Sequence, residues 1–400
     1  MTRDAVIHRS AIGEAITLDA LSDDPYPIYA RLRRDAPVAW APALDMWLVT
    51  RYEDVRSVLL DDVSFVVGTP RSLLFATFGE QMLTSEAETH RRYRDSGTQI
   101  AFMPRNIASR LVDRIGARVA RLLDPIITKG EADLRQAVAT RLPVQVMLDL
   151  FGLPDADEAL LRDWYDAFEA ALANHEHHAA VKTRAAVAST AFHDHLQAHL
   201  EQLRHCPNDG LLSAWLAVPS ERRLSDAEIR RNALIVMFGG ISTVEALILN
   251  TLWALVQHPQ ELTVICRERA KLPAAVDETM RWIAPVQSAT RHATCDALIA
   301  GVAIPAGAVV NCMIASANRD DTVFADPDIF WPRRANAARH LGFATGPHHC
   351  LGQHLAKLEA TVAIGALLDR TTDLRLAASA ALRGHEFRQP RTLPLTWRIV

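Results

Sequence analysis

Cysteine is scarce in this 400-residue chain, and the few cysteines lack the spacing that a metal ribbon or a disulfide framework requires. They are odd in number and form no C-x-x-C pair, which argues against a disulfide scaffold, a zinc ribbon and a covalent c-type haem attachment. We therefore expect reduced thiols of the kind found in cytosolic proteins. The five are Cys206, Cys266, Cys295, Cys312 and Cys350.

Charge of one sign is also lacking. Lys and Arg total 43 against 47 Asp and Glu, which gives a net charge of −4. Such a balance provides no electrostatic basis for binding nucleic acid. Residues 1–20 contain no apolar run of signal-peptide length, so we expect a cytoplasmic protein that does not enter a membrane. A hydrophobic content of 49% is enough for one large core or two smaller ones.

One apolar run, residues 233–256, is nevertheless about as long as a membrane span and carries a single charge, Glu245. Small and polar residues lie inside it, at Gly239-Gly240 and Ser242-Thr243. Lipid would penalise these groups, whereas a helix buried inside a large protein tolerates them beside a ligand. The pattern favours a buried helix.

The rest of the chain has mostly helical periodicity with short β-type runs. The spacing predicts helices that begin near Pro25 and at Tyr52–Leu60, and a strand at Met46–Thr50. Residues 291–316 are rich in β-branched residues around a turn at 304–307, which predicts short paired strands.

Residues 133–203 have the pattern of successive amphipathic helices, interrupted at Gly152-Leu153-Pro154. The cluster His175-Glu-His-His178 indicates a loop that either binds a metal or, as is commoner for surface histidines, is merely solvated. Repeats, low-complexity tracts and linkers are absent from the sequence. We therefore expect residues 1–400 to form a single domain that is mainly α with small β-sheets.

The segment Gly342–Gly352, GFATGPHHCLG, carries the strongest chemical signal. Leucines follow it at helical spacing, which predicts that Cys350 sits at the start of a helix, where free amide groups and the helix dipole favour the thiolate. Gly346 and Gly352 would let the backbone turn sharply beside a flat ligand, and Phe343 could pack beneath that ligand. Such a loop suits a planar macrocycle whose metal is held by one sulfur.

Two other interpretations compete. A zinc site would need ligands from spaced positions, whereas His348, His349 and Cys350 are consecutive. A cysteine hydrolase would need a strand before the turn and a parallel sheet, which the helical pattern does not predict.

The pattern Phe343-x-x-Gly346-x-His348-x-Cys350-x-Gly352 resembles the haem-binding signature of the cytochrome P450 family. The resemblance extends along nearly the whole chain, in the order typical of soluble bacterial members. It implies a cytochrome P450 fold that holds haem b (iron protoporphyrin IX) between a long central helix and the cysteine-loop helix, with Cys350 as the iron ligand. The matching segments are DPYPIYARLRRDAPVAW, MWLVTRYEDVRSVL, LPVQVMLDLFGLP, FGGISTVE, DETMR and ANRDDTVFADPDIF.

The resemblance also assigns residues that support the cofactor. Glu278 and Arg281 in DETMR lie three residues apart, where a helix allows an ion pair, and by resemblance this pair is buried. The two propionates of a haem need cationic or hydrogen-bonding partners. By resemblance these are His90, Arg94, Arg291 and His348, whereas His349 matches no such position. The Asp-Pro-Pro usual before His90 is here Glu86-Ala87-Glu88.

On the oxygen side, Gly239 and Gly240 would leave room for a diatomic molecule, and Thr243 fits the family's oxygen-side threonine. The departure is Ser242, because most relatives carry an acid there that relays protons. Glu245 follows Ser242 by three residues and lies about 200° around the helix from Thr243. Either Glu245 feeds a rerouted water chain, or the enzyme is slow at classical oxygen activation and performs different haem chemistry.

By resemblance the protein is a monooxygenase that takes electrons from a separate ferredoxin and its NAD(P)H-dependent reductase. We expect it to be a monomer that acts on a small hydrophobic substrate, for instance in secondary metabolism. A second class stays open: a peroxide-driven, coupling or rearranging enzyme, or a ligand-binding homologue without turnover. The docking charges we predict are Arg333, Arg334, Arg339 and Lys357. The predicted pocket lining is residues 66–78, 160–200, Val236 and Pro285–Ala289.

Overall fold

The computed structural model describes residues 10–70, 72–172, 174 and 178–400. These residues form two compact units, which we describe separately. The first unit comprises the described residues within 1–67, 249–350 and 379–391, and the second comprises those within 68–248, 351–378 and 392–400. The expectation of a single domain stays a prediction.

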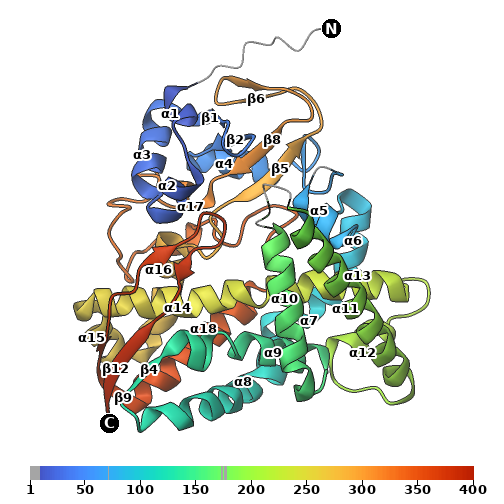
Figure 1. The fold of residues 1–400 in the computed structure, drawn as a ribbon, viewed down its shortest axis with the longest axis vertical. Helices are drawn as coiled ribbons and strands as arrows, with labels where there is room; N and C mark the ends of the chain where they lie inside the picture. Colours follow the sequence, from blue (N-terminus) through green and yellow to red (C-terminus); the bar gives the residue numbers. More distant parts are fainter. Residues whose placement is uncertain (1–9, 71, 173, 175–177) are drawn as a thin grey trace. The chain divides into compact units, whose positions relative to one another are not determined.

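The first unit is built around a five-stranded sheet in the order β1-β2-β8-β5-β3 (Figure 1). All neighbouring strands are antiparallel except β2 and β8, which are parallel. The strand predicted from Met46 is confirmed as β2. The strands are β1 (Val38–Ala41), β2 (Met46–Val49), β3 (Phe65–Val66), β5 (Ala289–Ala293) and β8 (Val309–Cys312), with separate hairpins β6 (Ala297–Ile299)/β7 (Val302–Ile304) and β10 (Leu382–Arg383)/β11 (Gln389–Pro390).

Short helices complete the first unit. The helix α4 spans Tyr52–Leu60 as predicted, and its apolar residues Val55 and Val58 are buried in one cluster with Val310 of β8. The predicted strand region 291–316 is confirmed for four strands but ends in a one-turn helix, α17. The helices are α1 (Ala11–Glu14), α2 (Leu18–Asp23), α3 (Tyr26–Asp35), α4, α15 (Pro259–Arg267), η3 (Arg269–Lys271), α16 (Leu272–Trp282), α17 (Ile314–Ala317) and η4 (Ala337–Arg339).

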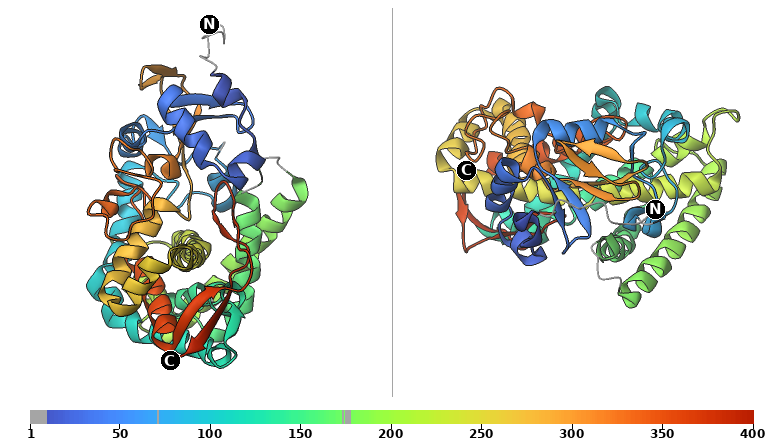
Figure 2. Two further views of the ribbon diagram at one scale, coloured as in Figure 1. Left: turned by 90° about the vertical axis from the view of Figure 1, so that its left-hand side faces the viewer. Right: turned by 90° about the horizontal axis from the view of Figure 1, so that it is seen from above.

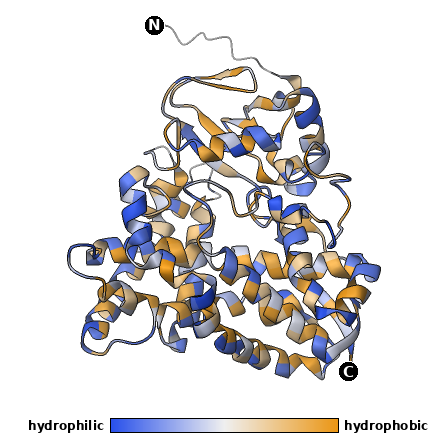
Figure 3. Ribbon diagram, turned by 180° about the vertical axis from the view of Figure 1, so that it is seen from behind, coloured by the Kyte–Doolittle hydropathy of each residue, from blue (hydrophilic) through white to orange (hydrophobic). Residues whose placement is uncertain are grey.

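The second unit is mainly helical, and Figure 3 shows apolar and polar segments alternating along its long helices, as amphipathic packing requires. Helices α8 and α18 pack together, as do α10 and α11. The helices are α5 (Leu73–Phe78), α6 (Ala87–Asp95), α7 (Thr98–Ala101), α8 (Pro104–Ile127), η1 (Arg135–Ala139), α9 (Leu142–Phe151), η2 (Asp155–Asp157), α10 (Glu158–Leu172), α11 (Ala179–His205), α12 (Leu211–Leu216), α13 (Asp226–Gly239) and α18 (Gln353–Arg370).

The predicted interruption at 152–154 is confirmed, because Gly152 ends α9 in the left-handed conformation (φ +76°) that glycine adopts without strain. A small sheet in the order β4-β12-β9 completes the unit, and Figure 2 shows β9 and β12 side by side near the C-terminus. Its strands are β4 (Glu131–Asp133), β9 (Thr371–Leu376) and β12 (Pro394–Ile399).

The long apolar stretch forms two helices in sequence, α13 and α14 (Ser242–Gln257), and the division between the two units falls within α14. A capping box between Ser225 and Glu228 starts α13. The stretch Asp226–Gln257 is long and apolar enough to cross a membrane, but 78% of its most apolar window is buried within the protein. This burial is that of a core helix.

Helix α18 carries a fully buried carboxyl group, that of Glu359. Neither of its oxygens has a hydrogen-bond partner among the described residues. Burial raises the pKa of Glu359 well above its ordinary value, because the charged carboxylate would lose its hydration. The folded protein therefore holds this proton more tightly than the unfolded chain does.

We predict that the wild-type protein loses stability relative to Glu359→Gln as the pH rises above the carboxyl's ordinary value. An acid whose pKa is raised by folding penalises the folded state once it must ionise, and glutamine removes that penalty. Urea unfolding of both proteins between about pH 5 and about pH 9 measures the difference. The control is Glu131→Gln, which replaces an exposed carboxylate on β4 of the same unit. A difference between wild type and Glu359→Gln that does not change with pH would contradict the prediction.

Candidate functional site

The cysteine loop, residues 342–350, is closed by its own backbone. The Cys350 N–H donates to the Phe343 carbonyl (2.9 Å), and the His349 N–H donates to the Gly346 carbonyl (3.0 Å). Cys350 is half-buried. The prediction that Cys350 sits at the helix start is wrong in detail, because α18 begins at Gln353 with Gly352 as its N-cap.

The two glycines of the motif differ in their backbone requirement. Gly346 has φ +76°, and a Cβ there would lie 2.6 Å from the Leu59 carbonyl oxygen. Glycine is therefore needed at 346 for the fold of the loop itself. Gly352 has φ −86°, and among the described residues other than its chain neighbours none places an atom within 4 Å of the position of a Cβ. The backbone does not require glycine at 352, which fits a close approach by a non-protein group.

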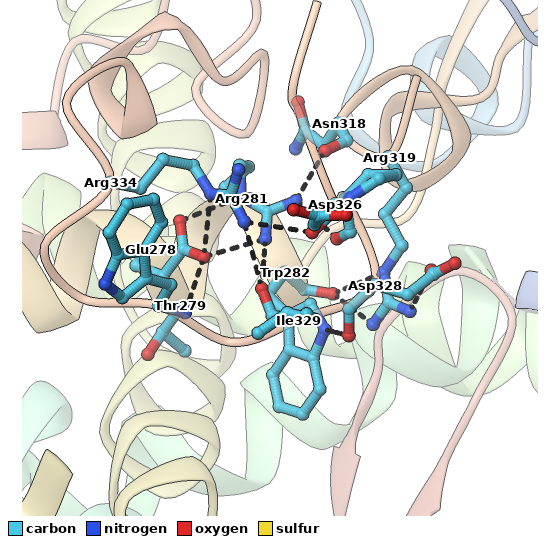
Figure 4. A network of polar contacts seen from close by, with 12 residues as sticks. Glu278, Thr279, Arg281, Trp282, Asn318, Arg319, Asp326, Asp328, Ile329 and Arg334 are labelled. Carbon is cyan, nitrogen blue, oxygen red and sulfur yellow. Dashed lines mark hydrogen bonds and ion pairs between the residues drawn. The ribbon is translucent and has the colours of Figure 1, made fainter. Parts of the chain in front are cut away.

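The predicted pair Glu278 and Arg281 is confirmed as a contact, and it is the centre of a larger buried network (Figure 4). The Arg281 Nη2 and Nε atoms donate to the two Glu278 oxygens at 2.7 and 2.8 Å. Arg334 Nε donates to the same carboxylate at 3.1 Å. The side chains of Glu278 and Arg281 are 0% exposed and that of Arg334 is 3% exposed.

Further bonds from Arg281 join α16 to the chain that leads to the cysteine loop. Its Nη1 donates to the carbonyls of Asn318 (3.0 Å) and Pro327 (2.8 Å). Burial lowers the pKa of the Arg281 guanidinium, and the Glu278 carboxylate opposes that shift. Because Arg334 belongs to this buried network, our prediction that it is a docking charge is wrong.

The predicted propionate partners are distributed between the two units. In the first unit, Arg291 on β5 and His348 in the cysteine loop are both buried. In the second unit, His90 is buried and Arg94 is half-buried, four residues apart on α6. Buried cations and imidazoles fit carboxylate groups. The roles of these residues stay predictions.

Helices α13 and α14 are separated at Gly240-Ile241, where the oxygen-side residues were predicted. The Thr243 hydroxyl donates to the Gly239 carbonyl (2.6 Å), four residues earlier, so it occupies an acceptor that a continuous helix would use. Apart from the backbone of its own helix, none of the described residues has an atom within 4 Å of a Cβ built on Gly239, whereas a Cβ on Gly240 would contact the Met147 sulfur of α9. Gly239 is thus the open position, and Gly240 serves packing.

Ser242 faces α10. Its buried hydroxyl accepts a hydrogen bond from the Tyr165 hydroxyl, and the Tyr165 ring stacks on Phe238 at 5.2 Å between ring centroids. Glu169, one turn further along α10, has its pKa raised by burial, and its hydrogen bond with Ser242 opposes the shift. Sequence reasoning placed Tyr165 and Glu169 only within a broad pocket-lining range, because neither belongs to a motif.

Glu245 faces a different element. Its buried carboxylate accepts a hydrogen bond from Arg135 Nε of η1 at 2.8 Å. Burial raises the pKa of Glu245, and the Arg135 guanidinium opposes that shift. A proton relay through Glu245 has to compete with this ion pair, and the hypothesis stays a prediction.

The remaining predicted residues, for the pocket lining and for partner docking, differ in how far their side chains are exposed. Val236 on α13 is half-buried. Arg333 pairs with Glu261 at 3.1 Å, and Arg339 is exposed in the same unit, while Lys357 on α18 is half-buried in the other. The predicted histidine cluster lies outside the described residues except for His178.

A family model for cytochrome P450 matches residues 144–372, more than half of the chain. The chain belongs to the cytochrome P450 family. It is 33% identical to the cytochrome P450 monooxygenase PikC of Streptomyces venezuelae, over 94% of this chain and 91% of that protein. It is also 33% identical to the 6-deoxyerythronolide B hydroxylase of Saccharopolyspora erythraea, over 90% and 92%.

A solved P450 from Bacillus megaterium, CYP109E1 in complex with testosterone, has the same fold, with a TM-score of 0.86. It is 26% identical, and the alignment covers 93% of this chain and 97% of that one. The P450 fold predicted from the sequence is thereby confirmed. The chain is an oxygenating oxidoreductase of a family that carries haem iron, and bacterial members work with redox partners.

We predict that Glu278→Gln lowers the free energy of unfolding by about 3–5 kcal/mol, because it leaves two guanidinium groups buried without their counter-charge. Glu268→Gln is the matched control, since Glu268 also pairs with a cation three residues later, Lys271, but both side chains are exposed. That change should cost less than about 1 kcal/mol. Urea unfolding followed by circular dichroism measures both, and similar losses in the two variants would refute the prediction.

Proposed function

We propose that this P450 is a haem-thiolate monooxygenase that inserts oxygen from O₂ into a small, largely hydrophobic molecule, by hydroxylation or epoxidation. The observation that carries the proposal is the cysteine loop, which holds one half-buried thiol in a backbone-closed turn within the family motif. The names of two relatives, a monooxygenase and a 6-deoxyerythronolide B hydroxylase, support the same reaction class.

The donor set fits haem b. The Cys350 thiolate would be the iron ligand, and Phe343, Gly346 and Gly352 would shape the loop around the macrocycle. Positive or hydrogen-bonding side chains would hold the propionates, and we assign this role to Arg291, His348, His90 and Arg94. When bound, the haem supplies the oxygen-activating chemistry, which the thiolate ligand tunes.

On the oxygen side, the protein's task is to hold a hydroxyl and to deliver protons. We place Thr243 at this position, because its hydroxyl donates to the Gly239 carbonyl where α13 ends and α14 begins. Ser242 cannot supply charge, but its hydroxyl can pass a proton that another group supplies. Glu169 is a candidate donor, because its raised pKa keeps the carboxyl protonated to higher pH, and Tyr165 orients the same hydroxyl.

Electrons would come from a separate ferredoxin and its NAD(P)H-dependent reductase, with Arg333 and Arg339 as exposed charges for an acidic partner. We expect the protein to act in the cytoplasm as a monomer.

A specific observation favours one alternative: with a serine at 242, the enzyme would be suited to peroxide-driven or rearranging haem chemistry, which does not depend on proton delivery to O₂. Turnover with hydrogen peroxide alone distinguishes this alternative.

We predict that the dithionite-reduced protein with carbon monoxide shows the strongly red-shifted Soret band of thiolate-ligated haem. Cys350→Ala should lose that band, because no sulfur remains to bind the iron, while Cys312→Ala should keep it, because Cys312 is buried in the sheet core of the first unit. Absorption spectroscopy of the three proteins is the test. A wild type that takes up no haem, or a Cys350→Ala protein with an unchanged band, would refute the proposed cofactor role.

We predict that Glu169→Gln lowers the fraction of NADH consumption that yields product by several-fold, and that Ser242→Asp restores coupling in that background by placing an acid beside Thr243. The wild-type coupling should fall as the pH rises through the Glu169 pKa, and Glu169→Gln should lack this dependence.

Glu245→Gln is the comparison for the relay. A coupling loss in Glu245→Gln and none in Glu169→Gln would instead assign the relay to Glu245, and no change in either would remove both acids from the proposal. Product and NADH are measured in the same reaction.

A further inference from the structure

Three side chains of the second unit converge outside the haem-related residues. His195 and His199 lie four residues apart on α11, and Asp157 ends η2 directly before α10. The His195 Nε2 lies 2.8 Å from Asp157 Oδ2 and 3.1 Å from His199 Nε2. The His199 Nε2 lies 3.4 Å from the same Asp157 oxygen. The three atoms thus form a small triangle.

The neighbouring structure holds this triangle in place. The packing of α10 on α11 sets the Trp164 ring edge-on to His195, with 5.4 Å between ring centroids. The adjacent acid Asp155 is instead bound to Arg118, together with Asp149 of α9. Asp157 is therefore the acid that faces the histidines, and its side chain is 12% exposed against 23% for His195 and 16% for His199.

Hydrogen bonds alone cannot account for all three short distances between these atoms. Each Nε2 atom has a single in-plane site, which holds either a proton or a lone pair. If His195 Nε2 donates to Asp157, the same atom has nothing left to offer His199 Nε2 at 3.1 Å. A cation at the centre of the triangle would accept one lone pair from each of the three atoms.

The distances suit a transition-metal ion. For bonds of about 2.0–2.2 Å to nitrogen and oxygen, neighbouring ligands of a tetrahedral zinc site lie roughly 3.3 Å apart. The three edges of the triangle, 2.8, 3.1 and 3.4 Å, lie close to that value. Two imidazoles with one carboxylate form a ligand set that zinc sites use.

We propose that Asp157, His195 and His199 bind a divalent transition-metal ion, Zn²⁺, with a fourth position left for water. The ion would join the residue before α10 to the C-terminal half of α11. It would thereby add a link between two helices that already pack together.

The test uses the haem-loaded, tag-free protein, dialysed against Zn²⁺ and then against buffer, with metal content measured by mass spectrometry. Iron reports the haem and zinc reports the proposed site. We expect one zinc per chain in the wild type, and its loss in His199→Gln and in Asp157→Asn. The matched control is His205→Gln, which changes an exposed histidine at the end of the same helix and should retain the zinc.

Two further readouts keep the test independent of folding. X-ray absorption at the zinc edge should show two imidazoles among nitrogen and oxygen ligands, and zinc should raise the thermal midpoint of the wild type and of His205→Gln only. A wild type that retains no zinc overturns the proposal and leaves a hydrogen-bonded cluster. Zinc retained equally by His199→Gln and Asp157→Asn also overturns it, because the metal would then be bound elsewhere.

Discussion

The first unit depends on one buried carboxylate, that of Glu278. Removing a carboxylate and two guanidinium groups from water costs several kcal/mol for each ion, so the network is stabilising only because its hydrogen bonds are almost complete. Glu278 accepts from Arg281, from Arg334 and from the Trp331 N–H (2.9 Å). The remaining donors of Arg281 are taken up by backbone carbonyls.

These backbone contacts link the network to the cysteine loop. Arg281 binds the Asn318 carbonyl, and the Asn318 amide donates to the Met280 carbonyl (3.3 Å) on α16. The Asn318 side-chain oxygen then accepts the Leu341 N–H at 2.7 Å, one residue before the loop begins. The path from Glu278 to the loop thus consists of buried hydrogen bonds to backbone groups. The network thereby helps to hold the backbone at Leu341, where the chain enters the loop.

Sequence reasoning predicted the elements and motifs that depend on local pattern. The helix at Tyr52–Leu60 and the strand from Met46 follow from periodicity, and the cysteine motif is read directly from residue types. The sequence could not predict that Arg334 is buried, because its burial is decided by Glu278, 56 positions away in the sequence. The pairs Glu268–Lys271 and Glu278–Arg281 have the same spacing, and only tertiary packing makes one exposed and the other buried.

The same limit explains why the acids near Ser242 could not be ranked from the sequence. Helical geometry put Glu245 on the flank of Ser242, but it did not reveal that Arg135 of η1 meets that flank. Nor did it reveal that α10 brings Tyr165 and Glu169 to the serine hydroxyl. Burial raises the pKa of both carboxyl groups, but protonating Glu245 gives up its ion pair with Arg135, whereas Glu169 has its hydrogen bond with the neutral Ser242 hydroxyl. On this physical ground Glu169, rather than Glu245, is the better replacement for the acid that most relatives carry at position 242.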